Sequence, residues 1–88
     1  MKVYNMTSSK GNKIANQFEI YDKKGRYFQS YNSIIAFINN KGQVYLDEYY
    51  WDYSVTTGKY RNIFLGDYRI EETREKRKSK EYKLKNLN

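Results

Sequence analysis

Two similar turn sequences set the strongest limit on how this chain can fold. Asp22–Gly25 reads Asp-Lys-Lys-Gly and Asn39–Gly42 reads Asn-Asn-Lys-Gly, so each short polar run ends in a glycine. A tight turn needs a residue in the left-handed conformation, which glycine adopts without steric cost. Each turn lies between segments rich in aromatic and β-branched residues. Successive hairpins of this kind predict an antiparallel β-meander.

The segments around the turns alternate as half-buried strands do. In residues 13–21, for example, Ile14, Phe18 and Ile20 fall on one face of an extended chain. Residues 33–38 are apolar on both faces, which is typical of a central strand. We therefore predict strands over residues 13–21, 26–31, 33–38 and 43–50, with residues 2–7 as a short edge strand.

The second half of the chain changes to helical spacing. In residues 54–66, apolar residues recur at positions 60, 63 and 64. Ser54, Thr56 or Thr57 can cap the start of this helix, and Gly66 can end it. Residues 70–80 form a second expected helix, with acidic residues at its start and basic residues at its end, as the helix dipole favours. This helix has almost no apolar face, so it is either highly solvated or ordered against a partner.

Residues 81–87 alternate again and can return to the sheet as a final strand. At 88 residues the chain makes a single domain over residues 1–88. Within it, a β-sheet core with the short helix occupies about residues 1–69, and the basic helix with the terminal strand occupies about residues 70–88. The predicted class is α+β, a small antiparallel β-meander of four to six strands with one short helix and one charged C-terminal helix.

The residue types present exclude several kinds of chemistry. The chain has no Cys and no His, which removes disulfide frameworks, zinc fingers and thiol chemistry. Asp47, Glu48 and Asp52 are its one compact acidic set, and strand alternation points Asp47 and Glu48 to opposite faces. We interpret these residues as exposed carboxylates that pair with neighbouring Lys or Arg. We expect no catalytic residue, no cofactor and no metal, and therefore not an enzyme.

No targeting or membrane segment is expected either. The longest apolar run is Ile34–Ile38, whereas crossing a bilayer takes roughly 20 residues. The start of the chain lacks the apolar stretch of a signal peptide. We expect a soluble protein that does not contact membranes.

Positive charge is concentrated towards the C-terminal end. Of the net charge of +7, residues 1–57 carry +2 and residues 58–88 carry +5. Such a basic segment points to a phosphate-rich partner or an acidic protein surface. The abundance of Lys, Asn, Ile and Tyr, whose codons are AT-rich, offers another explanation, because a genome of low GC content would produce it without selection for binding.

Aromatic residues make up 18% of the chain. Phe18, Phe28 and Phe37 are the expected core residues, while tyrosines near Lys and Arg can stack on the bases of single-stranded nucleic acid. The same tyrosines would also suit a protein interface, or could fill the core with their hydroxyls in water. As nucleic-acid-binding residues we predict Arg74, Lys76, Arg77, Lys78, Lys80 and Lys83 for phosphates, with Tyr49, Tyr53 and Tyr60 for stacking.

The stretch from Ala15 to Gly66 resembles a family of small uncharacterised proteins encoded by phages of low-GC bacteria. The resemblance is carried by sequences such as Ala15–Phe18, Phe28–Ala36, Val44–Glu48 and Trp51–Ser54. It continues through Lys59–Asn62 and Phe64–Gly66. The family brings no known activity, so no site residue can be transferred from it. It implies a phage setting, in the cytoplasm of a host cell.

These observations lead to alternative functions. The first is a phage protein that binds RNA or single-stranded nucleic acid and counters a host defence such as a CRISPR system. The second is an inhibitor that docks on a host defence or polymerase protein through residues 49–53, without nucleic acid. A third is a virion component that self-associates.

Overall fold

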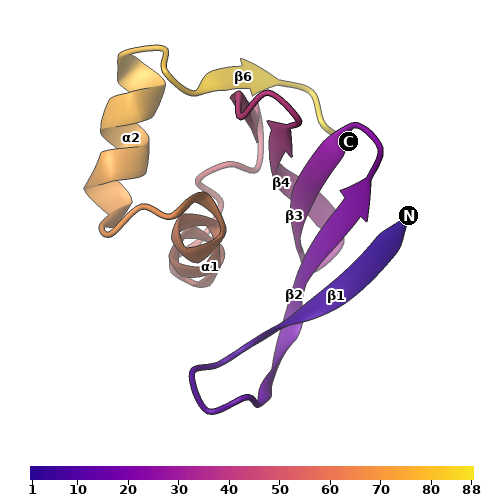
Figure 1. Ribbon diagram of the computed structural model, residues 1–88. Helices are drawn as coiled ribbons and strands as arrows, with labels where there is room; N and C mark the ends of the chain where they lie inside the picture. The colour runs from indigo at the N-terminus through magenta and orange to yellow at the C-terminus, as the bar shows by residue number, and fades with distance from the viewer.

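The glycine turns produce the hairpins that the sequence predicts. The computed structural model describes residues 1–88 as a six-stranded sheet with two helices on the same side of it (Figure 1). The predicted α+β class is confirmed. The strands are β1 (Lys2–Thr7), β2 (Lys13–Asp22), β3 (Gly25–Ser30), β4 (Ser33–Asn39), β5 (Val44–Asp47) and β6 (Lys83–Lys85). The helices are α1 (Val55–Leu65) and α2 (Ile70–Lys78).

The strands lie in sequence order across the sheet. Pairings from β1 to β5 are antiparallel, as a meander requires. β6 instead pairs parallel to β5, because the chain travels back along the sheet through α1 and α2 before it returns. β1 and β6 are therefore the two edges, and the basic C-terminal segment lies at the edge opposite the N-terminus.

Apolar residues of neighbouring strands line up beneath the helices. Phe28 pairs with Ala36, and Ala36 with Leu46, so the three side chains form one row across β3, β4 and β5. All three are fully buried, and the Phe28 ring stacks on Phe64 of α1 at 5.9 Å between centroids. Burying a side chain of this size stabilises the fold by about 1.5–3 kcal/mol. This row fixes α1 against the sheet.

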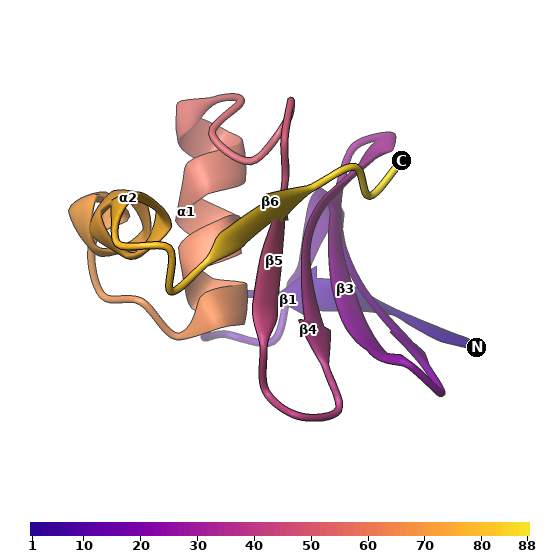
Figure 2. The same cartoon turned by 90° about the horizontal axis from the view of Figure 1, so that it is seen from above.

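The opposite face of the sheet carries no helix (Figure 2). Tyr27, Phe37 and Tyr45 form a ladder there, with centroids 4.5 and 6.2 Å apart and ring planes within 24°. Phe37 and Phe18 are half-buried, whereas Phe28 is completely buried. The expected core residues therefore divide, with Phe28 in the main core and Phe37 in a ladder that covers the outer face.

Asp47 corrects two expectations about the third hairpin. Its carboxylate is completely buried and accepts hydrogen bonds from the backbone N–H groups of Tyr49 (3.0 Å) and Tyr50 (2.9 Å). Because these N–H groups turn back to Asp47, β5 ends there and does not continue to residue 50 as predicted. Asp47 is also not the exposed, cation-paired carboxylate that the sequence suggested.

The same carboxylate holds the end of the chain. It accepts hydrogen bonds from the Leu87 N–H and the Asn88 side-chain amide, both at 2.9 Å. Burial alone would raise the pKa of Asp47, but these donors outweigh burial and lower the pKa below its usual value. Asn88 also bonds the backbone N–H and carbonyl of Ile34 in β4. Asp47 thus ties β5, the loop after it and the segment after β6 together.

The helices start and stop close to the predicted residues. The Ser54 hydroxyl caps α1 by accepting from the Thr57 N–H at 3.1 Å, and Gly66 ends the helix with φ of 78°. α2 carries Glu71 and Glu72 in its first turn and basic residues in its last turn, which suits the helix dipole. α2 nevertheless buries just one residue completely, Thr73.

Replacing Gly25 by alanine should destabilise the fold strongly. A β-carbon at Gly25 would collide with the backbone of Ile38 and Asn39. At Gly42 a β-carbon would meet nothing within 4 Å, although φ is also positive there. We expect G25A to lower the free energy of unfolding by more than about 2 kcal/mol and the matched control G42A by about 1–2 kcal/mol. Urea unfolding curves would measure the difference, and equal losses would contradict the close approach of β3 and β4.

Candidate functional site

Polar contacts hold α2 in place, since the helix has no apolar face. The Thr73 hydroxyl lies 2.8 Å from Asn62 Oδ1 of α1 and 2.6 Å from Asp67 Oδ2 of the connecting loop. A hydroxyl has one proton to donate, so the two acceptors share it. All three side chains are buried. The one completely buried residue of α2 is therefore held by directional hydrogen bonds.

Asn62 is in turn fixed by Arg61. Its side-chain oxygen accepts from Arg61 Nε at 3.2 Å and Nη2 at 3.1 Å. Arg61 is completely buried, donates to the carbonyl of Trp51 and pairs with Asp52 at 3.3 Å. Its guanidinium also lies 5.5 Å from the centre of the Trp51 ring. Burial lowers the pKa of Arg61, and the Asp52 carboxylate opposes that shift.

Asp67 holds the other side of α2. Its carboxylate pairs with Lys76 at 2.7 Å and accepts from the Tyr82 hydroxyl at 3.1 Å. The hydrogen bond to Asp67 is the main reason that the pKa of Lys76 is raised, while burial, followed by Asp67, raises the pKa of Tyr82. We call Asp52, Arg61, Asn62, Asp67, Thr73, Lys76 and Tyr82 the polar network. It links α1, α2 and the segment that leads into β6.

Two of the predicted phosphate-binding residues have acidic partners. Lys76 pairs with Asp67, and Arg74 binds Asp52 through Nε at 2.9 Å. Burial alone would raise the pKa of Asp52, but hydrogen bonds from Arg74 and Arg61 keep it below its usual value. Lys76 thus pairs with a residue outside its own helix. Arg74 and Lys76 therefore attach α2 to the rest of the molecule.

Three other predicted residues gather around one hollow. Arg77 at the end of α2, Lys80 in the following turn and Lys83 in β6 line a depression of about 250 Å³, with Tyr82 and Leu84 as its remaining walls. None of the three forms an ion pair within the chain. We call this site the basic hollow. Lys78 is the fourth predicted phosphate-binding residue that forms no ion pair. It is exposed on α2, outside the basic hollow.

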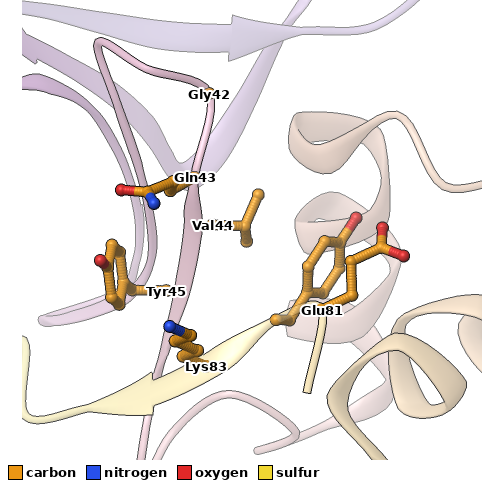
Figure 3. Close-up of a pocket in the computed structure, with 7 residues that line it drawn as sticks. Gly42, Gln43, Val44, Tyr45, Glu81 and Lys83 are labelled. Atoms are coloured by element: carbon orange, nitrogen blue, oxygen red, sulfur yellow. The ribbon is translucent and has the colours of Figure 1, made fainter. Parts of the chain in front are cut away.

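Lys83 also belongs to the neighbouring surface along β5. Figure 3 shows Lys83 and Tyr45 on one side of the strands, while Val44 and Glu81 point to the other side, towards the helices. Lys85, two residues further on, lies 5.5 Å from the centre of the Tyr45 ring. Glu81 is the acidic residue nearest to Lys83 in the sequence. Because it points to the other side of the strands, it does not neutralise the charge of Lys83. The lysines of β6 thus extend the positive surface beyond the basic hollow.

The predicted stacking tyrosines do not line the basic hollow. Tyr49 and Tyr53 lie in the loop after β5 and expose 78% and 67% of their surface. Tyr60 lies in α1, is half-buried against the core and has Lys59 over its ring at 5.3 Å. Tyr53 borders a groove with Tyr31, a residue that was predicted to end the strand over residues 26–31. The single polar residue Asn32 between two predicted strands was the available sign of a turn there.

The outer aromatic ladder is a poor platform for bases. Phe37 has Tyr27 on one ring face and Tyr45 on the other, and Lys85 covers the free face of Tyr45. The ladder therefore presents ring edges, while a stacked base needs a ring face. Burial, followed by the charge of Asp22, raises the pKa of Tyr27. The ladder serves the fold.

Comparison with known proteins identifies a family. A family model described as a family of unknown function, DUF8033, matches residues 1–83. The chain belongs to DUF8033. The match extends from β1 to the first residue of β6 and so includes the polar network and the basic hollow up to Lys83. No curated protein and no solved structure matches the chain. Neither α1 nor α2 has the length and apolar content of a helix that crosses a membrane.

Thr73→Val should destabilise the protein although it preserves the shape of the side chain. The change leaves Asn62 and Asp67 with one donor fewer in a buried site, which costs about 1–3 kcal/mol of unfolding free energy. Thr56→Val, on the exposed surface of α1, is the matched control and should change stability by less than about 0.5 kcal/mol. Chemical denaturation would compare the two variants. Equal stabilities would show that the Thr73 hydroxyl does not hold α2.

Proposed function

We propose that this DUF8033 protein is a non-enzymatic binding protein whose ligand is RNA or another single-stranded nucleic acid. One observation carries the proposal: Arg77, Lys80 and Lys83 line one hollow and none of them has an acidic partner. Cations held close together in this way bind successive phosphates and release counterions from the nucleic acid. Lys85 continues the positive surface along β6 and adds a further contact for the backbone.

The conformation of Lys80 supports the proposal. Lys80 follows the Ser79 C-cap of α2 and has φ of 67°, a position that favours glycine. A side chain in this conformation costs about 1–2 kcal/mol. The fold thus carries a lysine where glycine would be easier to accommodate, and the lysine lines the basic hollow. A binding role gives this strained residue a purpose.

The proposed setting is an infected bacterial cell. The composition rich in AT-coded residues and the resemblance to small phage proteins support a phage origin, with action in the host cytoplasm. A small nucleic-acid-binding protein in that setting could occupy the guide or target nucleic acid of a host defence such as a CRISPR system. Purification from infected cells, with the bound nucleic acid sequenced, would test this setting.

Neutralising the basic hollow should remove a defined part of the salt dependence of binding. With single-stranded RNA, three phosphates held in the basic hollow should account for about 20-fold of the affinity that the wild type loses between 50 and 200 mM salt, a log–log slope of about −2. R77Q/K80Q/K83Q should bind weakly and with a slope shallower by about 2 units. Fluorescence anisotropy over a salt series would measure both values.

The matched control is K2Q/K10Q/K13Q, which removes the same charge from β1, β2 and the loop between them, on the side of the sheet away from β6. It should keep most of the affinity and lose little of the slope. Equal losses in the two triple variants would contradict a localised site. Protein that carries no nucleic acid at low salt and binds a host protein instead would favour docking on that protein.

Lys80→Gly separates binding from folding. Glycine suits the left-handed conformation at this position, so the midpoint of thermal unfolding should stay the same or rise. Affinity for RNA should fall, and the salt slope should become shallower by about 0.7 units, the value of one single-strand phosphate contact. Calorimetry and anisotropy on the same preparation would decide. A more stable variant with unchanged affinity would remove Lys80 from the site.

A further inference from the structure

A groove lined by tyrosines lies beside the basic edge of the sheet. It forms where the turn between β3 and β4 faces the loop that follows β5, and it encloses about 440 Å³. Tyr31, Asn32 and Ser33 line one wall, and Tyr50 and Tyr53 line the other. Every residue of its lining is uncharged. We call it the tyrosine groove.

The tyrosine groove holds hydrogen-bonding groups that the fold does not use. The hydroxyls of Tyr31, Tyr50 and Tyr53 make no hydrogen bond within the chain, whereas those of Tyr21 and Tyr82 do. Tyr31 and Tyr53 expose 49% and 67% of their surface, and the Tyr50 and Tyr53 rings meet edge to face at 6.0 Å. The exposed rings of Tyr31 and Tyr53 are thus available to a flat ligand with polar edges.

Tyr31 is held in a conformation that is unusual for its residue type. Its φ is 56°, in the left-handed region that Gly, Asn and Asp adopt more readily. The Tyr31 N–H donates to the Asn16 carbonyl at 2.7 Å, and the Gln29 side chain donates to the Tyr31 carbonyl at 2.8 Å. Strain of this kind persists where neighbouring bonds enforce it, and it concentrates at functional sites. Here it directs an aromatic ring to the tyrosine groove.

The tyrosine groove is connected to the basic edge through β6. The Lys85 carbonyl accepts from the N–H of Glu48, the residue that begins the loop carrying Tyr50 and Tyr53. On the far side, Asn88 bonds Ile34, the neighbour of Ser33 in the groove. Lys83 and Lys85 lie two residues apart on β6, roughly 7 Å along the strand. The end of β6 is therefore joined to both segments that line the groove.

We infer that the tyrosine groove receives an unpaired base of the nucleic acid whose phosphates lie along β6 and the basic hollow. The inference rests on the proposed function. A base is flat, neutral and edged with hydrogen-bonding groups, which matches aromatic rings, hydroxyls and an amide without any charge. A phosphate would find no cation in the groove. A paired base must first unpair and unstack, which costs a few kcal/mol, so the groove favours single strands over duplex.

Oligonucleotides with and without bases test the inference. The probes are a single-stranded oligothymidine of about 12 nucleotides and an abasic oligomer with the same number of phosphates. The wild type should bind the oligothymidine about 5- to 150-fold more tightly than the abasic oligomer, the range expected for one stacked base. Y31N, which suits the left-handed turn, should fold normally and lose this preference. Y68A removes an exposed tyrosine outside the groove and should keep the preference.

The outcomes separate this inference from the proposed function. Salt-dependent binding with the same base preference in the wild type and Y31N would overturn the inference and leave the proposed function intact. Failure to bind either oligomer at low salt would overturn both. Loss of capture of a host protein in Y31N, with unchanged binding of both oligomers, would assign the groove to a protein and overturn the base-binding inference.

Discussion

The shared proton of Thr73 is the interaction on which the functional half of the molecule depends. α2 is strongly charged and buries no apolar residue completely, so the hydrophobic effect that fixes α1 gives it little help. Its position comes from Thr73 between Asn62 and Asp67, supported by Arg61 and Lys76. A fully satisfied buried network has strict geometry, because each broken bond leaves a desolvated group without a partner. The polar network thus gives a mostly solvated helix one defined orientation.

This arrangement divides the basic residues into two groups. Arg74 and Lys76 face acidic partners and hold α2, while Arg77, Lys80 and Lys83 face outward around the basic hollow. The net charge of the segment therefore overstates the charge available to a ligand. The division into two groups also explains why the basic hollow is local. α2 is held to the rest of the molecule through one face, and its last turn lies at the edge of the sheet. The free cations lie at that edge, and the tyrosine groove lies between the β3–β4 turn and the loop after β5.

The sequence predicted the parts of the fold that follow from apolar periodicity and turn chemistry. The glycine turns, the antiparallel strands up to β5, and α1 with its Ser54 and Gly66 caps were all found near their predicted residues. Buried polar groups were not predictable in this way. Asp47 looks like a surface residue in the sequence, and its four donors come from positions as far apart as Tyr49 and Asn88. Tyr31 was assigned to a strand, because a two-residue turn with an aromatic residue in the left-handed conformation is uncommon.

Hydrogen exchange of the α2 amides in the native protein tests the central claim most directly. If the polar network holds the helix, the amides from Arg74 to Lys78 should be protected from exchange. Their opening free energy should lie within about 1–2 kcal/mol of the opening free energy of the amides in the core strands β3 and β4. Exchange of the α2 amides at rates near those of an unstructured peptide, while β3 and β4 remain protected, would contradict the account. The basic hollow would then lack the fixed geometry that the proposed function requires.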